Sequence, residues 1–280
     1  MKAKSWILMA ALSVCASMSA ADLSVVSTEK LDVKGYYPVL SPDGSKVLFT
    51  TSDHDGLKSL DLSSSEITLI DNAPGTGFDP AFSADGKSVI YRSIVKVDGL
   101  IRRDVKSYDL ATGEKVQLLE PSRGNVDTRQ FVGKTFAYGS ARTQAIEVSL
   151  DGKKQTINPI ESGYRYLWAS VSPSNSKLVF TEVYSGLFVS ELDGTKAKFL
   201  ASRAEFPCWA GDNYVVALYT EDDGYVVTKA KVIAVDIESG KVIELTDGSS
   251  IVNGVTATKD KVVYATEDGE MFIMNIKITE

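Results

Sequence analysis

The chain has 280 residues, of which 44% are hydrophobic and 24% are charged, so it has the composition of an ordinary globular protein with a core. It contains 37 acidic and 30 basic residues, a formal net charge of −7, and no run of basic residues. Because such a chain repels phosphate backbones, nucleic acid is not expected as a partner.

Residues 1–21 have the pattern of a secretory signal peptide. Lys2 and Lys4 precede an apolar run from Trp6 to Val14, and small residues follow, so cleavage is expected after Ala20 or Ala21. The apolar run is shorter than the ~20 residues that a membrane-spanning helix needs, and no transmembrane span is predicted. Loss of the two lysines leaves 28 basic and 37 acidic residues, a net charge of −9. The sequence therefore predicts a periplasmic or secreted protein.

The two cysteines have different expected fates. Cys15 ends the segment 12–15, which resembles a bacterial lipobox, but Val14 stands where a lipobox has a small residue, so a lipoprotein is not expected. Cys208 then remains alone and cannot form an intramolecular disulfide. It lies between Pro207 and Trp209, and we expect a buried, unreactive thiol.

After a β-rich segment at 23–33, a turn followed by a β-rich stretch recurs six times. Each stretch ends in an aromatic or large apolar residue, and these residues are about 43 positions apart: Phe49, Tyr91, Tyr138, Phe180, Leu218 and Tyr264. A period of this length with several short strands per unit is the sequence signature of a β-propeller.

Each unit is predicted to form four strands, the third of which alternates apolar and polar residues, as in Leu60-Asp61-Leu62. The sixth unit is short of one strand. We expect segment 23–33 to pair beside the strand at 270–277 and to complete this blade, which would leave the ring without an open edge. The sequence therefore predicts an all-β, six-bladed β-propeller closed by the N-terminal strand, with residues 22–280 as a single domain.

The turn itself has a structural explanation. In Pro42-Asp43-Gly44 the proline fixes φ, the aspartate can bond to its own backbone, and the glycine takes the left-handed position. We expect Asp43 and its counterpart Asp85 to serve the turn rather than a binding site.

The wider phrase Pro38-x-x-Ser41-Pro42-Asp43-Gly44, repeated as Pro80-x-x-Ser83-Ala84-Asp85-Gly86, resembles the repeat of the TolB-type, WD-like propellers. The resemblance extends over residues 36–277. It implies binding of a protein or another ligand in the bacterial periplasm, although the family also includes enzymes. A counterpart of the separate N-terminal domain of TolB proper is not expected, because segment 23–33 is too short.

The single histidine limits the catalytic chemistry that can be predicted. Metal-dependent lyases of related propellers need several histidines, and this chain has His54 alone, between Asp53 and Asp55. A Ser-His-Asp triad would also depend on His54, and no G-x-S-x-G elbow precedes a helix. We expect His54 in a solvated loop between the second and third strands of the first blade, and we predict no metal and no cofactor.

Carboxylates at the starts of inner strands are the remaining candidates for chemistry. Asp79, Asp127 and Glu205 occupy similar places in their units and could converge beside Arg129 and Arg165. Two such groups across a cleft would suit glycoside hydrolysis. Acids that bond to backbone or to the arginines would instead be structural.

The starts of the inner strands share one face of a propeller with the loops between second and third strands, and we call this face the mouth. We expect the principal ligand site there, formed by Tyr37, Asp79, Asp127, Arg129, Arg165, Glu205, His54, Arg92, Tyr184 and Asp222. The long segments 93–104 and 220–231 are expected at the same face. Mixed charge with aromatic edges suits a peptide or glycan better than a lipid or phosphate.

Three functions remain open. The leading hypothesis is an exported, TolB-like propeller that binds a protein, peptide or glycan of the cell envelope without catalytic activity. A carbohydrate-active hydrolase or lyase would require carboxylates of different blades about 5–10 Å apart across an open pocket. A structural module of a cell-envelope assembly would expose a large flat apolar patch.

Overall fold

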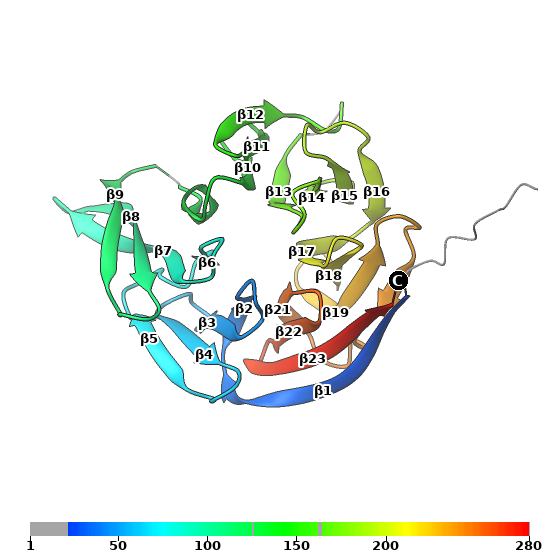
Figure 1. Ribbon diagram of the computed structural model, residues 1–280, viewed down its shortest axis with the longest axis horizontal. Helices are drawn as coiled ribbons and strands as arrows, with labels where there is room; N and C mark the ends of the chain where they lie inside the picture. The colour runs from blue at the N-terminus through cyan, green and yellow to red at the C-terminus, as the bar shows by residue number, and fades with distance from the viewer. Residues whose placement is uncertain (1–21, 125, 162–163, 280) are drawn as a thin grey trace, which may run out of the picture.

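The computed structural model describes residues 22–124, 126–161 and 164–279. These residues form six antiparallel sheets that stand as blades around a central axis, so the fold is an all-β, six-bladed β-propeller (Figure 1). The predicted blade count is confirmed. The predicted signal peptide lies outside the described residues. Within these residues, no helix has the length and apolar character required to cross a membrane.

In blades one to five the strands follow one another in chain order from the axis outward. Blade one contains β2 (Tyr36–Leu40), β3 (Lys46–Thr50), β4 (Leu57–Asp61) and β5 (Ile67–Asp71). Blade two contains β6 (Ala81–Phe82), β7 (Ser88–Val97), β8 (Leu100–Asp109) and β9 (Lys115–Ser122). Blade three contains β10 (Phe136–Ser140), β11 (Ala145–Leu150) and β12 (Lys153–Ile157).

The second half of the ring is built in the same way. Blade four contains β13 (Tyr166–Val171), β14 (Lys177–Glu182), β15 (Gly186–Glu191) and β16 (Lys198–Ala201). Blade five contains β17 (Ala204–Ala210), β18 (Tyr214–Asp222), β19 (Val227–Asp236) and β20 (Val242–Glu244). Blade six contains β21 (Val252–Ala257), β22 (Lys261–Thr266), β23 (Glu270–Thr279) and, outermost, β1 (Asp22–Lys34).

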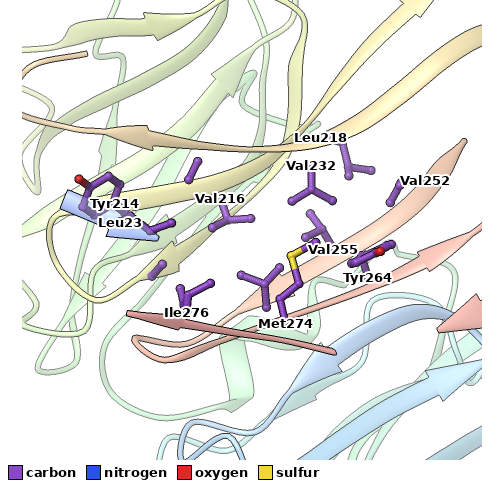
Figure 2. Close-up of a cluster of buried hydrophobic side chains, with 13 residues drawn as sticks. Leu23, Tyr214, Val216, Leu218, Val232, Val252, Val255, Tyr264, Met274 and Ile276 are labelled. Carbon is purple, nitrogen blue, oxygen red and sulfur yellow. The ribbon is translucent and has the colours of Figure 1, made fainter. Parts of the chain in front are cut away.

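The N-terminal strand closes the ring, as predicted. β1 runs antiparallel to β23, from the pair Asp22 and Thr279 to the pair Lys34 and Glu270 (Figure 1). Leu23 of β1 is buried in the apolar cluster between blades five and six, near Tyr214 (Figure 2). The closing strand therefore contributes to the core as well as to the sheet.

Blade three differs from the prediction of four strands. In the described residues it has three, and the segment before β10 forms the 3-10 helix η1 (Thr128–Phe131). Asp127 caps η1, because its Oδ1 accepts a hydrogen bond from the backbone N–H of Arg129 at 3.0 Å. This local bond gives the backbone an alternative to strand pairing.

The repeated turn forms as predicted. Asp43 Oδ1 accepts hydrogen bonds from Ser41 Oγ at 2.6 Å and from the Ser45 backbone N–H at 3.0 Å, and Gly44 has a φ of +66°. The Ser41 hydroxyl, followed by the Ser45 N–H, holds the pKa of the Asp43 carboxyl below its ordinary value. Asp85 makes the equivalent bonds to Ser83 and Lys87 in blade two.

Apolar side chains fill the boundaries between blades. Clusters of buried residues join five of the six neighbouring pairs of blades in the described part of the chain. Blades two and three are the exception. Their boundary instead contains an open hollow between Ile90 and Leu118 on one side and Phe131 and Val132 on the other.

Candidate functional site

The inner strands of four blades carry the same irregularity near the mouth. Register shifts occur in β2, β13, β17 and β21. An aromatic residue with left-handed backbone lies within three of these bulges: Tyr37 (φ 52°), Trp168 (51°) and Phe206 (52°). Asp79, just before β6, has a similar φ of 49°. A bulge re-aims a side chain, so this repeated feature sets one residue of each blade at an equivalent position around the mouth.

A column of stacked groups joins blades one and two. The rings of Tyr37 and His54 stack with centroids 4.1 Å apart, and His54 lies 4.9 Å from the ring of Phe78. The Arg92 guanidinium carbon lies over the Phe78 ring, 4.0 Å from its centroid. His54 lies in the predicted loop between β3 and β4, and its neighbours Asp53 and Asp55 are exposed, but its imidazole is half-buried between two aromatic rings and Nδ1 lies 3.3 Å from the Gly77 carbonyl.

The acids and arginines of blades two and three balance one another. Arg129 forms an ion pair with Asp127, with Nε donating to Oδ1 at 2.7 Å, and its Nη1 donates to the Ala169 carbonyl of blade four at 3.1 Å. Burial lowers the pKa of Arg129, but attraction to Asp127 and Asp79 outweighs it and raises the pKa overall. Burial dominates at Arg92 and lowers its pKa, although Asp79 and Asp127 act in the opposite direction. Asp127 and Arg129 thus belong to the framework of the mouth.

Blade four presents open aromatic surface. Tyr164 and Tyr184 are 54% and 80% exposed, and their ring centroids are 6.1 Å apart. Arg165 is exposed beside them, and within the described residues its side chain makes no hydrogen bond or ion pair. The Glu182 carboxylate holds this loop by accepting the Tyr184 N–H at 3.1 Å. Two flat rings and one free guanidinium therefore face solvent together.

Blade five contributes aromatic and acidic groups. Phe206 lies 4.3 Å from Trp168 of blade four, measured between ring centroids. Half-buried Glu205 makes no hydrogen bond or ion pair within the described residues, and burial, followed by repulsion from Asp222, raises its pKa. Asp222 accepts the Gly224 N–H at 2.9 Å and so also shapes its turn. Neither Glu205 nor Asp222 forms an ion pair within the described residues.

The two long segments at the mouth are hairpins. Residues 93–104 belong almost entirely to β7 and β8, which are joined by a tight turn at Asp98 and Gly99, both with positive φ. Residues 220–231 form a similar hairpin of β18 and β19. They extend the blades rather than form free binding loops.

The described residues offer few groups for nucleophilic catalysis or metal binding. Burial raises the pKa of the Cys208 thiol to about 12, and its Sγ donates to the Val216 carbonyl, so the thiolate is disfavoured. The described residues contain no group of three or more His, Cys, Asp or Glu side chains placed to hold a metal ion.

Two hollows lie away from the mouth, on the flanks of the ring. One, of about 420 Å³, separates blades two and three. The other, of about 440 Å³, separates the outer strands of blades four and five. None of the ten residues predicted for the mouth lines either hollow.

Phe78 and Asn253 at the mouth were not predicted. Phe78 contacts the His54 ring, and Asn253 occupies the bulge of β21. The Oδ1 atom of Asn253 is buried and has no hydrogen-bond partner in the described residues. An alignment of the repeats would have marked both, because Phe78 precedes the predicted Asp79 and Asn253 lies in the inner strand of the sixth unit.

Comparison with family models gave no match, and comparison with curated proteins gave none either. Solved structures do match. A candidate TolB from Agrobacterium tumefaciens has 18% identity and a TM-score of 0.59 over 88% of this chain and 90% of its own. The Cps50 (Swd1) propeller domain of Myceliophteria thermophila has 10% identity and a TM-score of 0.54 over 90% and 100% of the two chains.

An enzyme structure is similar to the same degree. The GH74 enzyme of Niastella koreensis has 10% identity and a TM-score of 0.55, over 90% of this chain and 46% of its own. Identities this low establish the fold alone. The similarity therefore agrees with the propeller predicted from the TolB-type repeat and leaves the function to be argued from the mouth.

Proposed function

We propose that the protein is an exported binding module and that its mouth holds a peptide or glycan segment of a cell-envelope partner. One observation carries the proposal: Asp127 and Arg129 are already paired with each other, whereas the rings of Tyr164 and Tyr184 are open to solvent. Paired acids suit a binding surface better than an acid–base catalyst, and exposed tyrosine beside arginine is typical of binding hot spots.

The charges at the mouth favour a peptide or glycan over a phosphate. Glu205 and Asp222 carry negative charge without an ion pair in the described residues, and they would repel a phosphate. Aromatic faces such as those of Trp168 and Phe206 suit sugar rings or apolar side chains.

Capture from cell-envelope extract tests this proposal. The chain without residues 1–21 is immobilised, its partner is identified, and affinity is measured for the wild type and for the double variant Arg165→Ala, Tyr184→Ala. Both side chains are exposed, so the variant should fold, and we expect affinity to fall at least about tenfold. Arg129 is a poor target, because its loss would leave Asp127 without a partner.

Val26→Ala, on the far edge of blade six, is the matched control and should bind as the wild type does. Unchanged affinity in a folded double variant would place binding on the flanks or on the opposite face.

A second function has one observation in its favour. Glu205 has a raised pKa beside the carboxylate of Asp222, a pattern used by glycosidases to separate an acid from a base. Hydrolysis of chromogenic glycosides by the wild type, abolished in Glu205→Gln, would support an enzyme. The binding proposal expects no turnover by either protein.

A further inference from the structure

The hollow between blades four and five has the character of a small-molecule site. Its volume of about 440 Å³ is within the usual range for ligand pockets. Residues of β16, β18, β19 and β20 form its wall, together with Ser202: Phe199, Leu200, Ala201, Ser202, Tyr219, Lys231, Ile233, Val242 and Glu244. It lies on the flank of the ring, so the inference is independent of the function proposed for the mouth.

Apolar side chains form one part of the wall of the hollow, beside the polar groups of Ser202, Lys231 and Glu244. Phe199 is 50% exposed although it packs edge-on against Phe188, with ring centroids 5.5 Å apart. Val242 of β20 is also exposed. Ile233 of β19 lines the same hollow and is buried. An apolar ligand here would cover Phe199 and Val242, whose surface is now in contact with water.

One buried cation faces this apolar wall. The Lys231 side chain is 11% exposed and its Nζ lies 5.2 Å from the centre of the Tyr219 ring. Its ion-pair partner, Glu244, is 59% exposed. The pair is therefore unequal in exposure: the ammonium group is largely buried, whereas its counter-ion lies at the exposed rim. A carboxylate within the hollow would meet this cation in a less polar setting than Glu244 does.

We propose that the hollow binds an amphipathic carboxylate with a single apolar tail, such as a medium-chain fatty acid. The tail packs on Phe199, Ile233 and Val242, and the carboxylate takes the place of Glu244 at Lys231. Charge selects the ligand's head group, because Lys231 is the one cation among the residues that line the hollow.

The proposal is tested by titrating the chain with decanoate and with decanol and following the titration by NMR. Both probes are kept below the concentration at which they form micelles. Decanoate should bind at least about tenfold more tightly than decanol and should shift resonances of Phe199 and Val242. Lys231→Met keeps the apolar stem and should abolish the preference for decanoate. Glu244→Gln removes the competing carboxylate and should tighten decanoate binding.

Two further variants keep the test decisive if Lys231→Met fails to fold. Phe199→Ala alters an exposed side chain and should weaken both probes. Lys229→Met, on the same strand but outside the hollow, should change nothing. Any of three results would overturn the proposal. The two probes could bind with equal affinity, or Lys231→Met could leave decanoate binding unchanged. The third is that the NMR resonance shifts are confined to the hollow beside Phe131.

Discussion

Single residues at the mouth have strained backbone. Tyr37, Trp168 and Phe206 each have a left-handed backbone, which costs about 1–3 kcal/mol for a residue with a side chain. Aromatic residues do not favour this conformation, so no local sequence pattern could have predicted it. The turn at Asp43 was predictable for the opposite reason, since proline, aspartate and glycine each favour the geometry they adopt.

Stacking at His54 was also beyond prediction. Its ring contacts come from Tyr37 of its own blade and from Phe78, just before the first strand of blade two. Packing between blades one and two therefore brings these three residues together. Sequence reasoning placed His54 at the mouth but could not determine that its imidazole would be enclosed.

The raised pKa of Glu205 predicts a pH-dependent stability. The folded state holds the proton of Glu205 more tightly than the unfolded chain does, so its favourable contribution exists below the ordinary carboxyl pKa and is lost as pH rises through the higher native value. Glu205→Gln should therefore stabilise the protein by roughly 0.5 kcal/mol near neutral pH and by nothing below about pH 4.

Urea denaturation at several pH values measures this difference. Glu267→Gln, at an exposed position of blade six, is the control and should show little change at any pH. A loss of stability in Glu205→Gln near neutral pH would mean that the carboxylate has a favourable partner.

At the scale of elements, the closing strand was predictable and the inner segment of blade three was not. A missing fourth strand in the last unit and a spare β-rich segment at the start pointed to the same pairing, and β1 fills that place. In blade three the periodic pattern suggested a strand, but Asp127 caps η1 through a bond two residues away. Capping by aspartate is a local signal that competes with a nonlocal sheet.

Closure by β1 predicts a strong effect from one buried side chain. Leu23→Ala removes a buried residue from the cluster between blades five and six and should cost about 2–4 kcal/mol. Val26→Ala, on the same strand but 66% exposed, should change the free energy of unfolding by less than about 0.5 kcal/mol. Equal effects in urea denaturation would show that β1 only borders the ring.

At the scale of the whole molecule, the repeat determined the architecture but not the ligand. A candidate TolB and a GH74 enzyme both have folds similar to this one, so the fold leaves function open. The ring is also uneven. Its boundary between blades two and three has a hollow in place of a buried apolar cluster in the described residues, and nothing in the repeat phrase predicts that difference.

The central claim, that the mouth is the binding face, is tested most directly by hydrogen–deuterium exchange of the chain with and without its captured partner. We predict slower exchange in the partner complex around Tyr37, Tyr164, Tyr184 and Glu205, with no change at the turns of Asp43 and Asp85 on the opposite face. Protection confined to those turns or to the outer strands, with the mouth unchanged, would contradict the account.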